Sequence, residues 1–353
     1  MPRRVLLHVS NHGFGHAARC GVLARALMDT GEVERLVVAV PRSYARFFEG
    51  TAQDPRVSFL DVETDLGIPL APGEFEPDAR RVARALDAWV SSFERLLEES
   101  VAALGPRPPD LVVVDASALG CELAARIGAP AVVVSNFEWH AQYVGLGLSG
   151  PSVERIRRAY ASVRLFLRYP FFLPSDALAH VPTRDVPACT RRPDPVEAAR
   201  IASGLPSPRV LFTLGGLITL CTPIRLERFR GSVIFTQGIA VEAPRAARVV
   251  DLSASGTNMQ SYLGAADLVV TKAGWSTVAE AAAARKPLLV VRRPGVPEDK
   301  SMLAGLEARG LARGVDLGEV PGGLMELVES GLAPTPGLPC DPDAVARECL
   351  SLV

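Results

Sequence analysis

The chain has 353 residues, of which 48% are hydrophobic and 22% are charged, and its formal net charge is -1. This composition excludes a disordered or fibrous protein, and the length predicts two domains, each large enough to bury its own core. The balanced charge gives no electrostatic footprint for nucleic acid, and six cysteines scattered without a metal-ligand spacing predict reduced thiols in a cytoplasmic protein.

In the first half of the chain, short apolar segments alternate with helical ones. The first apolar run, 5–9, is too short for a signal peptide or a membrane span, so we expect no transmembrane segment. Because these segments lack the polar alternation of half-exposed strands, they predict a parallel sheet covered on both faces. The predicted strands are 5–9, 36–40, 57–62, 111–114 and 131–134, and the predicted helices are 17–30, 78–99 and 119–127.

Two stretches interrupt this pattern. Residues 155–172 mix arginines with aromatic residues, which fits either a helix with a solvated basic face or a weak contact with an acceptor or a membrane surface. Residues 183–208 are rich in proline, which predicts a linker with few contacts.

The second half repeats the alternation, so the chain is predicted to be two α/β domains in tandem. An N-terminal domain at 1–182 and a C-terminal domain at 209–340 are followed by a closing helix at 341–353, with Asp341 as its cap. Parallel sheets bind ligands beyond the carboxyl ends of their strands, so we expect the site in the cleft between the domains. The predicted strands here are 210–214, 232–236, 248–252, 268–271 and 288–291, and the helices are 259–265, 276–284 and 299–309.

The loop after the first strand carries a glycine-rich pattern. Gly13, Gly15 and Ala18 match the dinucleotide-binding sequence GxGxxA. No acidic residue closes the second predicted strand to hold a ribose, but Arg42 there would suit a 2′-phosphate. A NAD(P)-binding oxidoreductase is therefore one alternative.

The same loop contains two histidines, and one of them is a candidate base. A neutral imidazole at a helix N-terminus has a lowered pKa and can accept a proton near neutral pH. We take His16 as that base and Asp115, which ends a buried predicted strand, as its orienting carboxylate. The alternative is that His16 caps its helix and Asp115 caps the helix that follows.

A second loop, after the strand at 268–271, predicts a phosphate site. The chain turns through Gly274 into a helix whose first turn carries Ser276 and Thr277, so free N–H groups and hydroxyls meet there. Lys272 is placed to reach the same anion, and Glu280 lies one turn further on, where a ribose could donate to it. An ordinary capping arrangement would explain the polar residues of the helix but neither Lys272 nor Gly274.

Two further loops complete the predicted site. Gly215 and Gly216 follow the first strand of the second domain and let the backbone approach a diphosphate. Glu298 and Asp299 begin a helix, where they either bind sugar hydroxyls or complement the helix dipole.

Taken together, these motifs resemble glycosyltransferases of the GT-B fold. Gly15-His16, Asp115, the segment 272–280 and the loop 294–299 are similar to bacterial UDP-glycosyltransferases and the peptidoglycan N-acetylglucosaminyltransferase branch. Residues 135–143 are similar to the glycosyltransferase-like domain found in front of plant arabinokinases.

The resemblance implies an α/β protein of two Rossmann-like doubly wound domains facing across a cleft. It implies an inverting, metal-independent transfer from a UDP or dTDP sugar to a hydroxyl of a small-molecule or lipid-linked acceptor, with no cofactor. The implied catalytic pair is His16 and Asp115. The implied donor contacts are Gly215, Gly216, Lys272, Gly274, Ser276 and Thr277 for the diphosphate, Glu280 for the ribose, and Glu298 and Asp299 for the sugar. The candidate acceptor contacts are His12, Arg19, Asn136 and Trp139.

The chain departs from the family pattern at three places. Arg19 stands where the family often has proline, Lys272 replaces the usual histidine, and Glu298-Asp299 replaces the common Asp-Gln. An epimerase or hydrolase of nucleotide sugars, or a sugar-nucleotide sensor without catalysis, would fit the same cleft.

Overall fold

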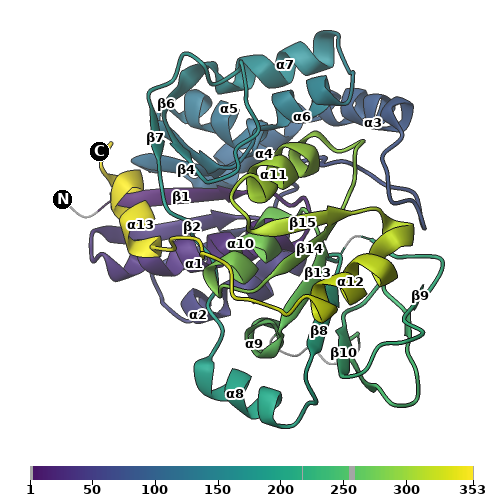
Figure 1. Ribbon diagram of the computed structural model, residues 1–353. Helices are drawn as coiled ribbons and strands as arrows, with labels where there is room; N and C mark the ends of the chain where they lie inside the picture. Colours follow the sequence, from purple (N-terminus) through teal and green to yellow (C-terminus); the bar gives the residue numbers. More distant parts are fainter. Residues whose placement is uncertain (1–2, 217, 254–258, 353) are drawn as a thin grey trace.

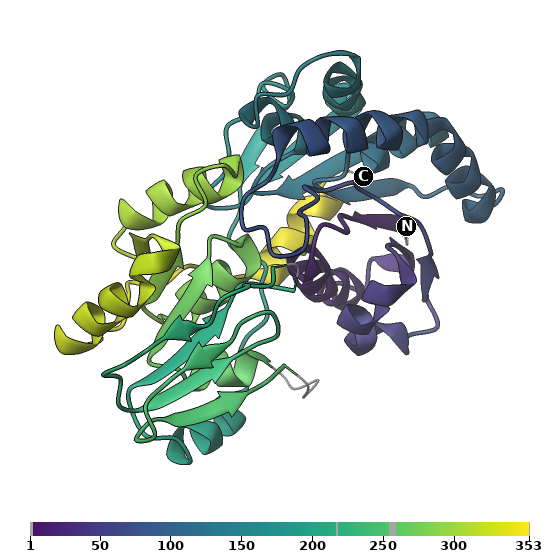
Figure 2. The same ribbon diagram turned by 90° about the vertical axis from the view of Figure 1, so that its right-hand side faces the viewer.

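The computed structural model describes residues 3–216, 218–253 and 259–352, which form two lobes (Figure 1). Each lobe is built on a parallel sheet, as the buried apolar runs predict. Figure 2 shows the lobes from the side, with the first at the upper right and the second at the lower left. The last residue of the predicted closing helix lies outside the described residues.

The first lobe has a seven-stranded sheet in the order β3-β2-β1-β4-β5-β6-β7. Successive residues of β1 pack into different clusters, with Leu7 on one face of the sheet and Leu6 on the other, because helices cover both faces. Its strands are β1 Arg3–Val9, β2 Val33–Ala39, β3 Val57–Leu60, β4 Leu111–Asp115, β5 Ala131–Ser135, β6 Val163–Arg168 and β7 Thr183–Asp185. Its α-helices are α1 Phe14–Asp29, α2 Glu49–Ala52, α3 Ala79–Ser91, α4 Phe93–Leu104, α5 Ala118–Ile127, α6 Trp139–Gly145 and α7 Pro151–Ala159.

The second lobe has a six-stranded sheet in the order β12-β10-β8-β13-β14-β15. A short ribbon, β9 Ile224–Arg225 with β11 Val241–Glu242, lies beside it. Its strands are β8 Arg209–Thr213, β10 Ser232–Phe235, β12 Arg248–Asp251, β13 Leu268–Lys272, β14 Leu288–Val291 and β15 Ala312–Val315. Its helices are α8 Pro195–Ser203, α9 Met259–Ala265, α10 Trp275–Ala283, α11 Pro297–Glu307 and α12 Val320–Glu329.

Chain order reverses once in each sheet, between β1 and β4 and between β8 and β13. The loops that leave the carboxyl ends of such neighbouring strands open a crevice, which is where doubly wound sheets bind ligands. The candidate base with its carboxylate and the predicted diphosphate contacts lie at the carboxyl ends of these two strand pairs, whereas Glu298 and Asp299 follow β14. The topology therefore brings the motifs of each lobe to one sheet edge.

The stretch 155–172 does not form the predicted helix throughout. Helix α7 ends at Ala159, and the chain then enters β6, which pairs in parallel with β5. The apolar residues Leu165 and Leu167 are buried in the sheet, so pairing with β5 overrides the helical pattern. Arg155 pairs with Glu94 and Glu122.

The stretch 183–208 is more structured than a linker with few contacts. Residues 183–185 form β7, which extends the first sheet, while α8 packs against α9 of the second lobe. The closing helix α13, Pro342–Leu350, returns to the first lobe and packs on α1. Asp341 caps it by accepting from the N–H of Ala344 at 3.0 Å, as predicted.

Candidate functional site

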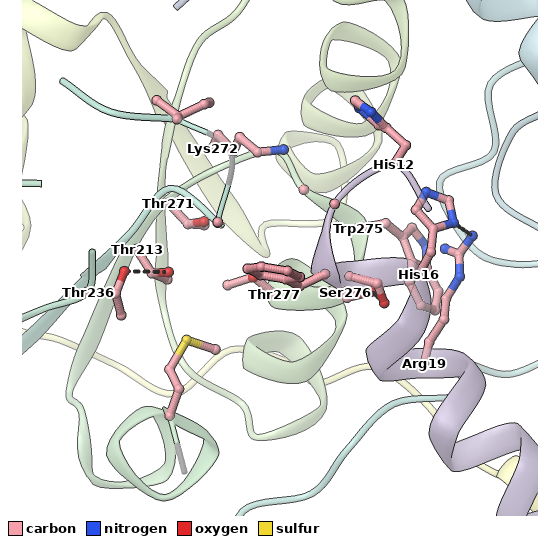
Figure 3. A pocket seen from close by; sticks show the side chains of 18 of the residues that line it. His12, His16, Arg19, Thr213, Thr236, Thr271, Lys272, Trp275, Ser276 and Thr277 are labelled. Carbon is pink, nitrogen blue, oxygen red and sulfur yellow. Dashed lines mark hydrogen bonds between the residues drawn. The ribbon is translucent and has the colours of Figure 1, made fainter. Parts of the chain in front are cut away.

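A cavity of about 1160 Å³ lies between the lobes and is lined by loops from both sheet edges. Figure 3 shows it with the loop before α1 on one side and the turn after β13 on the other. His12, His16 and Arg19 line it from the first lobe, and Lys272 and Thr277 line it from the second. The candidate base and the candidate phosphate site therefore share one cavity, although 256 residues separate His16 from Lys272 in the chain.

The β1–β4 edge brings the candidate base and its carboxylate together. Val9, the last residue of β1, is aligned with Asp115, the last residue of β4. The chain turns through Gly13 into α1, and His16 Nδ1 then lies 3.0 Å from Asp115 Oδ2. Helix α5 is capped by Ser117, so the alternative that Asp115 is its N-cap is wrong.

Asp115 is buried and held as a charged carboxylate. Arg19 donates to Oδ1 through Nη2 and to Oδ2 through Nε at 3.2 Å, and the thiol of Cys20 donates to Oδ2 at 3.1 Å. Burial alone would raise the pKa of Asp115, but Arg19 and His16 outweigh it and hold that pKa well below its usual range.

Burial lowers the pKa of His16, and the charges of Arg19 and Lys272 lower it further, while Asp115 opposes them. The imidazole is therefore neutral near pH 7. A hydrogen bond from Nδ1–H to Asp115 leaves Nε2 free to accept a proton.

Of the residues predicted to contact the acceptor, His12 lies on the cavity wall, whereas Asn136 and Trp139 lie in the interior. His12 lines the cavity, and its Nδ1 accepts from the N–H of Ile68 at 3.3 Å. Burial holds the pKa of His12 well below 6.5, helped by the neighbouring charges of His16, Lys272 and Arg293. Asn136 and Trp139 are 0% and 1% exposed and do not line the cavity, so they are not placed to touch an acceptor.

The β8–β13 edge forms the candidate diphosphate site. Gly215 and Gly216, after β8, line the cavity, and Gly215 has a φ of 74° that favours glycine. Helix α10 begins after Gly274, and no side chain caps its first turn, so backbone N–H groups there are available to an anion.

Lys272 points across the cavity toward the loop that bears His12 (Figure 3). It forms no ion pair with any residue in the described part of the chain. A Cβ on Gly274 would lie 3.1 Å from Nζ, so the glycine leaves room for the ammonium group. Burial lowers the pKa of Lys272, and the charges of Asp299 and Glu298 oppose this shift.

Ser276 lines the cavity, as predicted, and also joins the two lobes. Its hydroxyl donates to the carbonyl of Gly15 at 2.7 Å, which joins α10 to the loop before α1. A Cβ on Gly15 would lie 3.1 Å from Ser276 Oγ, so this glycine permits the two lobes to approach. Thr277 keeps its predicted place on the cavity wall.

The two carboxylates predicted to contact the sugar, Glu298 and Asp299, each interact with other side chains. Glu298 accepts from Asn136 Nδ2 at 2.7 Å and from Gln142 Nε2 at 3.2 Å, and burial raises its pKa to about 7. Asp299 lies 3.4 Å from Arg293. Both line the cavity.

Glu280 does not line the cavity. It is 2% exposed and accepts from Arg191 Nε at 2.7 Å. Arg191 itself reaches the cavity wall from the stretch predicted to be a linker. A ribose bound in the cavity would therefore contact Arg191, which lies next to Glu280, the ribose contact that the resemblance implies.

Several cavity residues were not expected from the sequence. Arg293 lines the cavity, and a row of threonines lies at or beside the carboxyl ends of the strands: Thr213, Thr236 and Thr271. Thr236 donates to Thr213 at 3.1 Å (Figure 3). A hydroxyl residue at or beside the carboxyl end of a buried parallel strand is the sequence signal that could have indicated them.

Comparison with known proteins identifies the fold. Over nearly its whole length the chain is similar to CalG4, the calicheamicin glycosyltransferase, with a TM-score of 0.62, 18% identity and coverage of 100% of this chain and 93% of that chain. It is also similar to Arabidopsis thaliana UGT89C1 complexed with quercetin, with a TM-score of 0.63, 15% identity and coverage of 99% and 93%. The chain therefore has the GT-B fold, two Rossmann-like domains facing across a cleft, and the resemblance to GT-B glycosyltransferases is confirmed.

Sequence comparison locates the likeness more closely. Residues 245–328 match the Glycosyltransferase family 28 C-terminal domain. L-arabinokinase of Arabidopsis thaliana is 26% identical over 308 residues, which cover 85% of this chain. The chain spans 29% of the length of that relative. Every helix in the described part of the chain is too short or too polar to cross a bilayer.

Proposed function

We propose that this chain is a glycosyltransferase that moves a sugar from a nucleoside diphosphate sugar, UDP-linked or dTDP-linked, to a hydroxyl of a small-molecule or lipid-linked acceptor. One observation carries the proposal. The pair of His16 and Asp115 faces the cation Lys272 and the uncapped N-terminus of α10 across a single cavity. A base for the acceptor and a positive site for the leaving group are what such a transfer requires.

In the proposed reaction, the acceptor hydroxyl lies beside His16 Nε2, which takes its proton as the oxygen attacks the anomeric carbon. Asp115 holds the imidazole through Nδ1 and stabilises the imidazolium that forms. Attack from the side opposite the diphosphate inverts the anomeric configuration. The bond between the anomeric carbon and the diphosphate oxygen breaks, and both electrons leave with the diphosphate.

The leaving group gathers negative charge next to Lys272 and the first turn of α10. We propose that these groups stabilise it directly, so that the transfer is independent of a metal ion. Gly215, Gly216 and Thr277 are the further proposed phosphate contacts, because they line the same part of the cavity. Glu298 and Asp299 are the proposed sugar contacts. Arg191, which lines the cavity and is held by Glu280, is the proposed ribose contact.

The oxidoreductase alternative is less well supported. The GxGxxA loop is approached by α10, whose Ser276 hydroxyl bonds to the carbonyl of Gly15. A pyrophosphate at the start of α1 would compete with that contact.

The experiment has two parts. First, thermal unfolding is followed with UDP, dTDP, NAD and NADP; saturating ligand at 100 times its Kd stabilises the folded state by about 2.7 kcal/mol. We expect UDP or dTDP to raise the Tm and the nicotinamide nucleotides to leave it unchanged. Second, donor and acceptor panels are screened by mass spectrometry for glycosylated product.

With a productive pair in hand, His16→Ala is expected to lower kcat by about 10²- to 10⁴-fold while the Kd for UDP stays close to that of the wild type. Unchanged turnover in His16→Ala would contradict the assignment of the base. Product formed from the donor alone would favour an epimerase or hydrolase instead.

A further inference from the structure

Arg19, which stands where the resembling family often has proline, lies behind the candidate base among groups from both lobes. Its side chain is 2% exposed. Nη2 and Nε donate to the two oxygens of Asp115, and Nη1 donates to Asn136 Oδ1 at 2.8 Å. A guanidinium keeps its proton in a protein, so Arg19 is a permanent positive charge beside the pair of His16 and Asp115.

His16 Nδ1 lies 3.0 Å from Asp115 Oδ2 and also 3.0 Å from Arg19 Nη2. A ring nitrogen can donate to the carboxylate or accept from the guanidinium, but one atom cannot do both. A lone pair on Nδ1 would be repelled by the carboxylate oxygen. The carboxylate therefore favours the proton on Nδ1, whereas the N–H of Arg19 opposes a second donor there, so the tautomer depends on how Asp115 is held.

Arg19 is also tied to the second lobe. Asn136 accepts from Arg19 with Oδ1 and donates to Glu298 with Nδ2 at 2.7 Å. Since Arg19 only donates, the orientation of the amide is fixed. On another side, the guanidinium lies 4.9 Å from the ring of Trp275, the first residue of α10. Both helices that begin at the candidate donor site, α10 and α11, thus reach Arg19 directly or through one side chain.

We propose that Arg19 is a positioning residue: by holding both oxygens of Asp115 it fixes the acceptor of the His16 Nδ1 proton, and its own charge keeps His16 neutral. Asn136 and Glu298 make this arrangement depend on the position of the second lobe. The inference rests on the proposed function only in taking His16 as the base. Arg19 contacts His16 at Nδ1 and holds both oxygens of Asp115, so its proposed effect on the base is exerted through these contacts.

The charged and titratable groups around His16 come from four elements. They are Asp115 at the end of β4, Arg19 on α1, His12 in the preceding loop and Lys272 at the end of β13. Among the described residues, Arg19 is the one cation that contacts both His16 and Asp115. Burial lowers the pKa of His16 and the charge of Arg19 adds to this, in agreement with the geometry.

The test uses ¹⁵N NMR of the histidine rings, which reports the tautomer and the pKa of His16 without any substrate; the signal is assigned with His16→Gln. Arg19→Gln is expected to raise the pKa of His16 by about one to three units, because it removes a like charge and leaves Asp115 uncompensated. Arg25→Gln, on an exposed arginine of the same helix, is the matched control. A pKa in Arg19→Gln equal to that of the control overturns the proposal.

Arg19→Lys keeps the charge but cannot hold both oxygens of Asp115 and Asn136 at once. We expect a low pKa of His16 together with a loss of the pure Nδ1–H signature. Unchanged ring shifts in this variant would overturn the positioning role, even if Arg19→Gln does not fold.

The link to the second lobe is tested with Asn136→Leu, which changes no charge and does not contact His16. The ring shifts or pKa of His16 are expected to move by more than in Arg25→Gln. If they do not, the coupling to the second lobe is refuted while the role of Arg19 stands. Because no step of this test needs turnover, a failure of the proposed transfer and a failure of this inference give different results.

Discussion

Lys272 gives the most direct test of the donor site. The substitution Lys272→Met keeps the unbranched stem and removes the charge. The ammonium has no ion pair in the described part of the chain, so it is available to an incoming phosphate. A charge-assisted hydrogen bond to an anion contributes about 1.5–3 kcal/mol, which corresponds to a weakening of UDP binding by about 10- to 150-fold.

Isothermal titration calorimetry with UDP measures this change. Lys300→Met is the control, since Lys300 is exposed on α11 and is also a lysine. Burial lowers the pKa of Lys272, which means that the folded state disfavours its charge. Removing that charge is therefore expected to leave the free energy of unfolding unchanged or to raise it.

The same shift predicts the pH dependence of binding. In the wild type, UDP affinity should fall as the pH rises through the lowered pKa of Lys272, below 10.5, and Lys272→Met should lack that alkaline loss. Affinity of Lys272→Met within about twofold of Lys300→Met would refute the proposed phosphate site, because a lost charge-assisted hydrogen bond is worth at least about tenfold.

Three further predictions concern the interface and the core. Ser276→Ala is expected to lower the free energy of unfolding by about 0.5–1.5 kcal/mol through the lost bond between the lobes, and to leave UDP binding intact; a large loss of UDP affinity would instead return Ser276 to the phosphate site. Gly67→Ala should lower the free energy of unfolding by about 1–3 kcal/mol because its φ is +72°, and by more because the added Cβ would overlap the ring of His12. Gly31→Ala, with a φ of +75° and open space, carries only the first cost, so equal losses in urea unfolding would argue against the contact. Burial lowers the pKa of His8 from 6.5 to about 3. Between these values the unfolded chain binds a proton that the folded chain does not, so the free energy of unfolding falls as the pH falls, by up to about 1.4 kcal/mol per pH unit. His8→Leu should flatten this slope in unfolding curves taken from pH 7 to 4, and a slope equal to that of the wild type would contradict the assignment.

The sequence located most of the candidate site because loops after parallel strands converge at a switch point. His16 and Asp115 lie next to each other since β1 and β4 are neighbours in the sheet. Gly215 and Lys272 lie at one edge for the same reason, since β8 and β13 are neighbours. A motif placed after the right strand is therefore placed in space once the strand order is known.

Contacts between distant segments of the chain could not be predicted from the sequence. Ser276 is predicted to contact a phosphate, and the structure adds a bond from its hydroxyl to the carbonyl of Gly15. Glu280 was expected at a ribose, yet Arg191 holds it. A polar side chain near the start of a helix has the same sequence pattern whether it bonds to a ligand or to another part of the chain. Only tertiary packing distinguishes these two cases.

By itself, the sequence determined that the chain has two doubly wound domains with a cleft between them, and which polar residues the loops at that cleft carry. Buried strands, helices and glycine turns leave local patterns in the sequence, which is why these features could be predicted. The tertiary structure decided which charges neutralise one another. Arg19 could not be assigned to Asp115 from a spacing of 96 residues, since the distance that governs a Coulomb interaction is set by how the strands pair and how the lobes pack.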